Sequence, residues 1–219
     1  MTSDTEWHNR DNQRFYETLK PTGLYDFAKM SGMSPGQDLA PLSEMCLSAN
    51  HILEVGAGYG RVIDFLLNQG YSDKITAIEY CAHSYRYLVQ KYQQMAKISL
   101  VHDDISQYQT PERFDLILHL WSGLADFPKA IQPKVVKKLA QLLSKDGTLV
   151  IDSYGLHSIP LSATETDQQS FQLYMNDQTK YIYEPTTSEI KEYAELAKLT
   201  YHSRIDCQSS IGRERHLHI

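Results

Sequence analysis

The sequence predicts an α/β protein built on a seven-stranded, mostly parallel sheet, with an antiparallel last strand and helices on both faces. Two observations predict this class. From residue 51 onward, short apolar runs alternate with helical patterns, which is typical of parallel strands joined by crossover helices. In addition, three glycines at alternate positions follow the first apolar run, at the point where open sheets of this kind bind ligands.

Strand and helix patterns follow one another in order along the middle of the chain. The apolar runs that predict strands cover residues 51–55, 74–79, 98–102, 114–120 and 148–153. Helical periodicity runs to about residue 68 after the first strand, and later covers 82–95 and 129–143. Gly70 ends the first helix, and Lys145, Asp146 and Gly147 predict a turn into the fifth strand. Residues 51–153 are therefore expected to form the core of the sheet.

The flanking segments have other patterns. Residues 1–50 predict two or three short helices that act as a helical lid, broken at Pro21-Thr22-Gly23 and again at 32–36. Residues 154–185 predict an inserted flap with a β-hairpin, whose arms are 171–175 and 180–183. Residues 186–219 predict a closing helix at 188–198 and two closing strands, 199–207 and 213–219. We expect the whole chain, 1–219, to form one domain.

Composition excludes several classes of function. The 219 residues are 42% hydrophobic and 22% charged, as in ordinary soluble proteins. The formal net charge of −6 and the absence of a basic cluster argue against a nucleic-acid partner. The sequence begins with no signal peptide and contains no apolar run long enough to cross a membrane, so we expect a cytoplasmic protein. Cys46, Cys81 and Cys207 have no metal-ligand spacing and are expected to be reduced.

The glycine loop, Glu54 to Gly60, lies between an apolar strand and an amphipathic helix. Glycine permits positive φ angles, and without a Cβ it lets a ligand approach the main chain. The N-terminus of the following helix favours an anionic group. The loop therefore predicts a binding site for a ligand that carries a carboxylate or a phosphate.

Acidic residues follow the next two strands. Glu79 comes 19 residues after Gly60, where a carboxylate can accept hydrogen bonds from both hydroxyls of a ribose. Asp104 follows the third strand, where it can accept a hydrogen bond from an adenine amino group while Ile105 packs on the ring. Since the carboxyl ends of parallel strands share one sheet edge, we expect these side chains to surround one adenosine-like ligand.

This pattern resembles the class I S-adenosylmethionine-dependent methyltransferases, a Rossmann-like superfamily, and in particular its small-molecule members. The resemblance covers about residues 51–153 and implies S-adenosylmethionine as the cofactor. It differs in that glutamates stand at Glu54 and Glu79, where aspartates are commoner. The cofactor-binding residues that it implies are Glu54, Gly56, Gly58, Gly60, Glu79, Tyr80, Asp104, Ile105 and His119.

Other readings of the glycine loop stay open at this point. A nicotinamide-binding domain shares the first strands and the acidic residue, but its fingerprint is GxGxxG, whereas this chain has GxGxG. No NPPY-like segment and no Pro-Cys nucleophile occurs, so the patterns of two kinds of DNA methyltransferase are absent. Methyl transfer to a small-molecule oxygen or nitrogen is the favoured function. The alternatives are a protein methyltransferase and a non-catalytic protein that binds the cofactor.

Residues that could contact the substrate or act as a general base are expected at the strand ends and in the flanking segments. His119 ends the fourth strand and is the candidate general base, although a histidine in an apolar strand is more often a packing residue. Tyr16, Trp121 and Tyr154 are expected to line the substrate pocket, and Asp152 either contacts substrate or forms a salt bridge. No metal site is expected, and His216 and His218 are interpreted as surface residues. The sequence does not predict the oligomeric state.

Overall fold

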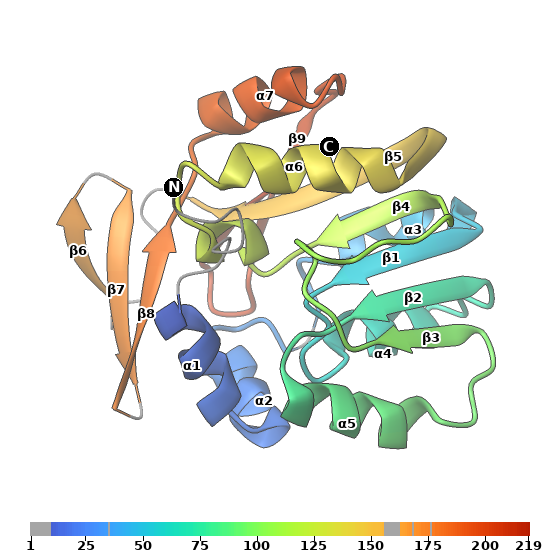
Figure 1. Cartoon of the computed structure of the whole chain (residues 1–219), viewed down its shortest axis with the longest axis horizontal. Coiled ribbons are helices and arrows are strands. Elements are labelled where there is room, and N and C mark those ends of the chain that lie inside the picture. The colour runs from blue at the N-terminus through green and yellow to red at the C-terminus, as the bar shows by residue number, and fades with distance from the viewer. Residues whose placement is uncertain (1–9, 35, 156–162, 168, 176) are drawn as a thin grey trace.

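The structure is a computed structural model that describes residues 10–34, 36–155, 163–167, 169–175 and 177–219. Its described strands form two sheets, one of seven strands and one of three. Figure 1 shows helices packed above and below the larger sheet, with the smaller sheet and the first two helices gathered at one end of it.

The seven-stranded sheet has the order β3-β2-β1-β4-β5-β10-β9. Strands β1 to β5 pair in parallel, and β10 pairs antiparallel with both β5 and β9. The expected mostly parallel sheet with an antiparallel last strand is therefore confirmed. Its strands are β1 (His51–Val55), β2 (Lys74–Ile78), β3 (Ile98–Val101), β4 (Phe114–His119), β5 (Leu143–Tyr154), β9 (Arg204–Gln208) and β10 (Glu214–His218).

Helices bury both faces of this sheet, which explains why the strands read as almost continuous apolar runs. Alternate residues point to opposite faces, so that Ile52 and Leu53, both fully buried, belong to different hydrophobic clusters. One face is covered by α3 (Ser43–Ser48), α4 (Arg61–Asn68) and α5 (Ala82–Tyr92). The other is covered by α6 (Gln132–Leu142) and α7 (Thr187–Leu196).

The N-terminal helices begin and end at slightly different places from those expected. Helix α1 covers Arg10–Thr18 and α2 covers Pro21–Met30, so the predicted break falls before Pro21, and Gly23 lies inside α2. Proline suits the first turn of a helix because its missing N–H has no intrahelical partner there. The second break is confirmed, since α2 ends just before Gly32, whose φ is +73°. A 3-10 turn, Ala40–Leu42, then leads into α3.

The predicted turn before the fifth strand was wrong. Residues 145–147 lie within β5, where the pairing with β4 is irregular: Phe114 is opposite Leu143 and Leu116 is opposite Thr148. Between these two pairs β5 contains more residues than β4, so residues 145–147 form a bulge within the strand and do not end it. Gly147 is needed there because a Cβ would lie 2.6 Å from the carbonyl oxygen of Phe114.

The flap is a three-stranded antiparallel sheet. The expected hairpin is confirmed as β7 (Ser170–Met175) and β8 (Gln178–Tyr183), with Asp177 in the left-handed region at φ 58°. A third strand, β6 (Ala163–Asp167), pairs with β7 and was not expected. Its residues are largely exposed, and so it lacks the apolar alternation that marks a half-buried strand.

Helix α1 fastens the flap to the main sheet. The side-chain amide nitrogen of Asn12 donates to the carbonyl oxygens of Asp126 and Tyr181, at 2.9 and 2.6 Å, and its oxygen accepts from the Tyr181 N–H at 2.6 Å. Asp126 belongs to the 3-10 turn Gly123–Asp126 that follows β4. The N-terminal segment, the β4 end and the flap therefore meet above the carboxyl edge of the sheet, where a third hydrophobic cluster forms.

Two glycines at the ends of α4 give a matched test of this packing. Gly60 has φ +87°, and a Cβ there would meet the Tyr92 ring at 3.0 Å and Leu88 at 3.1 Å. Gly70 has a similar φ of +82°, but a Cβ there would meet nothing within 4 Å. We expect Gly60→Ala to lower the free energy of unfolding by about 3 kcal/mol and Gly70→Ala by about 1 kcal/mol in urea titrations. Equal losses would contradict close packing at Gly60.

Candidate functional site

One cavity lies at the carboxyl edge of the parallel strands, and residues of α1, α2 and the flap contribute to its lining. Nearly all of the residues predicted from the sequence line it, although they come from six segments of the chain. These lining residues are Tyr16, Glu54, Gly56, Gly58, Glu79, Tyr80, Asp104, Ile105, His119, Trp121 and Tyr154. Gly60 is not among them, because it packs against α5 as described above.

The glycine loop presents open main chain to the cavity. Gly56 and Gly58 have φ angles of +78° and +58°, which side chains other than glycine rarely adopt. A Cβ on Gly56 would meet nothing within 4 Å, so this side of the loop leaves space for a ligand. The N–H groups of Gly56 and Ala57 donate to the carbonyl oxygen of Ile78, at 2.9 and 3.1 Å, and hold the loop against the end of β2.

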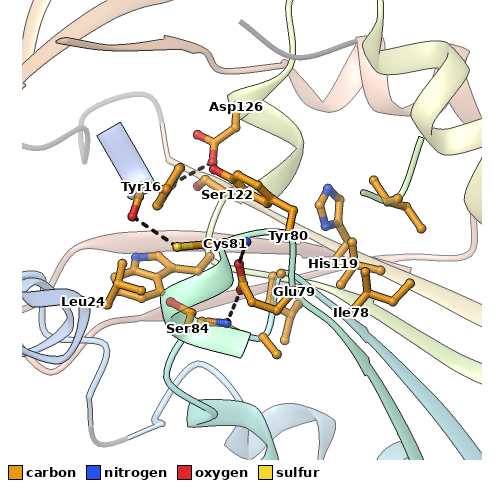
Figure 2. Close-up of a pocket in the computed structure, with 18 of the residues that line it drawn as sticks. Tyr16, Leu24, Ile78, Glu79, Tyr80, Cys81, Ser84, His119, Ser122 and Asp126 are labelled. Atoms are coloured by element: carbon orange, nitrogen blue, oxygen red, sulfur yellow. Dashed lines mark hydrogen bonds between the residues drawn. The ribbon is translucent and has the colours of Figure 1, made fainter. Parts of the chain in front are cut away.

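Glu79 joins this loop to the end of β2 through both of its carboxylate oxygens. One accepts from the Gly58 N–H and the other from the Cys81 N–H, each at 2.7 Å (Figure 2). The side chain is buried, and burial raises its pKa, while these two backbone N–H groups oppose the rise. Each oxygen keeps a second lone-pair direction, so Glu79 can also accept hydrogen bonds from a ligand.

Glu54, at the end of β1, is the other buried acid beside the loop. It is 4% exposed, and its Oε2 has no hydrogen-bond partner among the described residues. Burial raises its pKa to about 8, although the nearby Arg61 favours the charged form. A buried carboxyl oxygen without a partner indicates a place for a hydrogen-bond donor from a ligand.

The β3 end contributes an acidic turn to the same cavity. The Asp104 carboxylate accepts from the Ser106 N–H at 2.8 Å, and the Asp103 carboxylate accepts from the Asp104 N–H at 2.8 Å. These local bonds fix the turn, and Ile105 is 4% exposed. Because all three residues line the cavity, the turn offers it carboxylates beside an apolar side chain.

The β4 end turns sharply under the cavity wall. Trp121 and Ser122 both have left-handed φ angles, 56° and 54°, and the Ser122 N–H donates to the Asp152 carboxylate. Trp121 stacks on Phe27 of α2, with ring centroids 5.8 Å apart and planes 23° apart. His119 is 3% exposed and lies tightly below the turn, since a Cβ on Gly123 would meet its ring at 2.6 Å.

A buried charged network supports this turn, and sequence reasoning found only part of it. Arg215 is fully buried, with a 2.5 Å ion pair to Asp152 and its guanidinium 4.0 Å from the Tyr154 ring centroid. Asp152 thus forms the salt bridge that was one of its two expected roles. Glu184 accepts from the Tyr154 N–H at 2.7 Å, and burial raises the pKa of Glu184 to about 8. The neighbours of Arg215 in the sequence are Glu214 and His216, so no local pattern indicated that Arg215 is buried.

The roof of the cavity holds a second polar cluster, which we call the roof triad: Tyr16, Asp126 and Lys180. The Tyr16 hydroxyl donates to Asp126 at 2.7 Å and accepts from the Lys180 ammonium at 2.5 Å. Lys180 also forms an ion pair with Asp126 at 2.6 Å. Burial and the neighbouring Asp126 raise the pKa of Tyr16 well above its usual value, so it keeps its proton. Figure 2 shows Tyr16 and Asp126 close to Tyr80.

Arg61 is a further lining residue that the sequence did not reveal. It follows Gly60 at the start of α4, and its guanidinium donates to both oxygens of Asp38, at 2.7 and 2.9 Å, and to the carbonyl oxygen of Met33 at 3.3 Å. Its side chain is buried, and Asp38 raises its pKa. The pair ties the N-terminal segment to the glycine loop.

One of the two C-terminal histidines differs from expectation. His218 is 2% exposed and is hydrogen-bonded to Ser153 at 2.8 Å, so its reading as a surface residue was wrong. It lies on β10, which is an internal strand of the sheet, and burial lowers its pKa to about 4. No group of three metal-ligating side chains is found in the described parts of the chain. Likewise, no described helix has the length and apolar character that crossing a bilayer requires.

Several solved methyltransferases have the same architecture as this chain. The 1,6-didemethyltoxoflavin-N1-methyltransferase of Burkholderia thailandensis, solved with 1,6-didemethyltoxoflavin and S-adenosylhomocysteine, has a TM-score of 0.68 and 18% identity, over 94% of this chain and 84% of its own. An S-adenosylmethionine-dependent methyltransferase from Clostridium acetobutylicum ATCC 824 has a TM-score of 0.67 and 16% identity, over 90% and 96%. The N-methyltransferase NodS of Bradyrhizobium japonicum WM9 has a TM-score of 0.61 and 17% identity, over 96% and 97%.

The chain therefore has the Rossmann-like fold of the class I methyltransferases. Its segment 52–147, from β1 to the start of β5, matches the family model described as a methyltransferase domain. The resemblance inferred from the glycine loop is thereby confirmed. No curated protein matches the chain by sequence.

The buried acid Glu184 gives a test of the network below the cavity. A carboxyl group whose pKa rises from 4.5 to about 8 on folding takes up a proton between these values, so stability falls as the pH rises through this window. Glu184→Gln mimics the protonated acid and removes this contribution. Between pH 6 and pH 8.5, we expect the free energy of unfolding, measured by urea titration, to fall by on the order of 1 kcal/mol more in the wild type than in the variant.

The control is Glu165→Gln, which changes an exposed acid on β6 of the flap. Its pH dependence is expected to follow the wild type. If Glu184→Gln also follows the wild type, the raised pKa of Glu184 is contradicted.

Proposed function

We propose that this protein is an enzyme that transfers the methyl group of S-adenosylmethionine to an oxygen or nitrogen of a small molecule. The observation that carries the proposal is the cavity at the carboxyl edge. The open glycine loop lines this cavity together with Glu79, whose carboxylate accepts a hydrogen bond from the Gly58 N–H. Aromatic side chains, among them Tyr16 and Trp121, also line it. The methyltransferase-domain match over residues 52–147 supports the same activity.

In this proposal the cofactor lies along the ends of β1, β2 and β3. Glu79 accepts hydrogen bonds from the ribose hydroxyls, and Asp104, with Ile105 and Tyr80, holds the adenine. The glycine loop and the N-terminus of α4 face the carboxylate of the cofactor. The unpartnered oxygen of Glu54 then receives a hydrogen bond from its ammonium group, which satisfies the buried acid.

The chemistry requires little from the protein beyond alignment. Bound there, S-adenosylmethionine would supply a methyl group on a positively charged sulfur, which would leave as a neutral thioether with the electron pair of the broken carbon–sulfur bond once the acceptor's lone pair had bonded to the methyl carbon. The walls therefore act by holding the acceptor in line and by excluding water. The acceptor's proton leaves to a base or to solvent.

His119 is the candidate for that base, and this role stays a prediction. Its position at the end of β4 places it in the cavity wall, next to the sharp turn at Trp121. Its tight packing under Gly123 equally fits a residue that shapes the wall. The two roles differ in what they predict for turnover, and the second experiment below separates them.

Two features favour a small acceptor over a protein. The cavity is lined by Tyr16, Trp121 and Tyr154 and by the flap residues Leu173, Lys180 and Ile182, so side chains from several elements surround it. Neighbours in fold include an enzyme solved with the small molecule 1,6-didemethyltoxoflavin. We place the enzyme in the cytoplasm and expect no nucleic-acid partner, on the basis of its composition and net charge of −6.

The first experiment tests the cofactor site. Glu79→Gln replaces a carboxylate, whose two oxygens both accept hydrogen bonds, by an amide whose NH2 group would face a backbone N–H. We therefore expect the affinity for S-adenosylhomocysteine, measured by isothermal titration calorimetry, to fall at least about 30-fold. The matched control is Glu112→Gln, a carboxylate that pairs with Lys74 at the opposite edge of the sheet. Circular dichroism verifies folding. Unchanged affinity in a folded Glu79→Gln protein would contradict the proposed site.

The second experiment tests turnover and the role of His119. A labelled-methyl screen against metabolite and peptide pools is expected to mark small molecules and not peptides. With the acceptor found, His119→Gln is expected to lower kcat about 100-fold or more if His119 is the base, with little change in cofactor affinity. A stable, folded variant with unchanged kcat would assign His119 to packing. His202→Gln, in the segment before β9, is the control.

A further inference from the structure

The roof triad has one hydrogen-bond donor more than its own members use. An ammonium group has three N–H donors. Lys180 directs one to the Tyr16 hydroxyl at 2.5 Å, and its ammonium nitrogen lies 2.6 Å from one Asp126 oxygen in an ion pair. Asp126 uses its other oxygen for Tyr16. The described residues provide no further acceptor for Lys180, so a donor remains for a ligand, and Lys180 lines the cavity.

The triad is held where a ligand would meet it. Its members come from α1, from the 3-10 turn after β4 and from β8, and Asn12 bonds these same three elements together. The Lys180 side chain is 9% exposed and that of Asp126 is 16% exposed. A buried ammonium N–H without a partner is unfavourable, so the site favours an oxygen that accepts it.

The surroundings of the triad are largely apolar. Tyr16 packs in the hydrophobic cluster that also contains the cavity-lining residues Leu24, Phe27, Trp121, Ala125, Leu173 and Ile182. The stacked pair Phe27 and Trp121 gives one wall an extended aromatic surface. A planar apolar body bearing one oxygen would match both the wall and the donor.

The charge of the triad indicates which oxygen compounds fit. Asp126 is balanced by Lys180, so this part of the cavity offers no free negative charge to an ammonium group. A cationic acceptor would also lie beside Lys180 and, under the proposed function, beside the sulfonium. Like charges in a cavity of low polarity repel strongly.

We propose that the roof triad recognises the methyl acceptor, and that the acceptor is an uncharged, planar molecule whose oxygen accepts a hydrogen bond from Lys180. This inference rests on the proposed function, because it assigns the other half of the cavity to the cofactor. Lys180 is then a specificity-determining residue, and Tyr16 and Asp126 orient its ammonium group.

The test uses two probes that share one ring system, 2-naphthol and 2-(aminomethyl)naphthalene. Each is titrated calorimetrically into the full-length protein saturated with S-adenosylhomocysteine at pH 7. We expect 2-naphthol to bind and the aminomethyl compound, which is a cation at this pH, to bind at least about tenfold more weakly. Lys180→Met, which keeps the length of the side chain, is expected to weaken 2-naphthol binding about tenfold or more.

The control variant is Lys137→Met, an exposed lysine on α6, which is expected to bind both probes as the wild type does. The affinity of each variant for S-adenosylhomocysteine is measured in parallel, so that a misfolded flap is recognised. The inference is overturned if 2-naphthol fails to bind the wild type, if the cation binds as tightly, or if Lys180→Met binds 2-naphthol normally. Absent S-adenosylhomocysteine binding in the wild type overturns the proposed function instead.

Discussion

The carboxylate of Glu79 is the interaction on which the rest of the site depends. With one oxygen on the Gly58 N–H and the other on the Cys81 N–H, it links the glycine loop after β1 to the end of β2. These two hydrogen bonds fix the position of the glycine loop and leave the cavity beside it open. Two backbone N–H groups also offset the desolvation of a buried charge. The loop is therefore ordered before any ligand arrives, which lowers the entropy lost on binding.

Buried charge elsewhere in the molecule follows the same rule of compensation. Arg215 is paired with Asp152 and stacked on Tyr154, and Arg61 is paired with Asp38. Removing one partner from such a pair would leave an isolated buried charge, which is strongly destabilising. These pairs also connect distant segments: the first joins β10 to β5, and the second joins the N-terminal segment to α4. They hold the strained turn at the β4 end and the part of the N-terminal segment around Asp38 beside one cavity.

Much of the sheet could be predicted because its strands and its glycine loop leave patterns in consecutive residues. Strands buried on both faces read as apolar runs, and glycine at positive φ marks the loop, as at Gly56. β6 was missed since its exposed residues carry no pattern, and the bulge in β5 was missed since Gly147 signals a turn in either case. The roof triad was missed for another reason. Tyr16 lies 164 positions from Lys180, and no local pattern reports such a contact.

The most direct measurement is a crystal structure of the protein grown with S-adenosylhomocysteine. Our interpretation predicts the nucleoside in the carboxyl-edge cavity, with both ribose hydroxyls within hydrogen-bonding distance of the Glu79 carboxylate and the sulfur facing the aromatic roof. An empty cavity at saturating ligand, or the nucleoside bound elsewhere on the molecule, would contradict it.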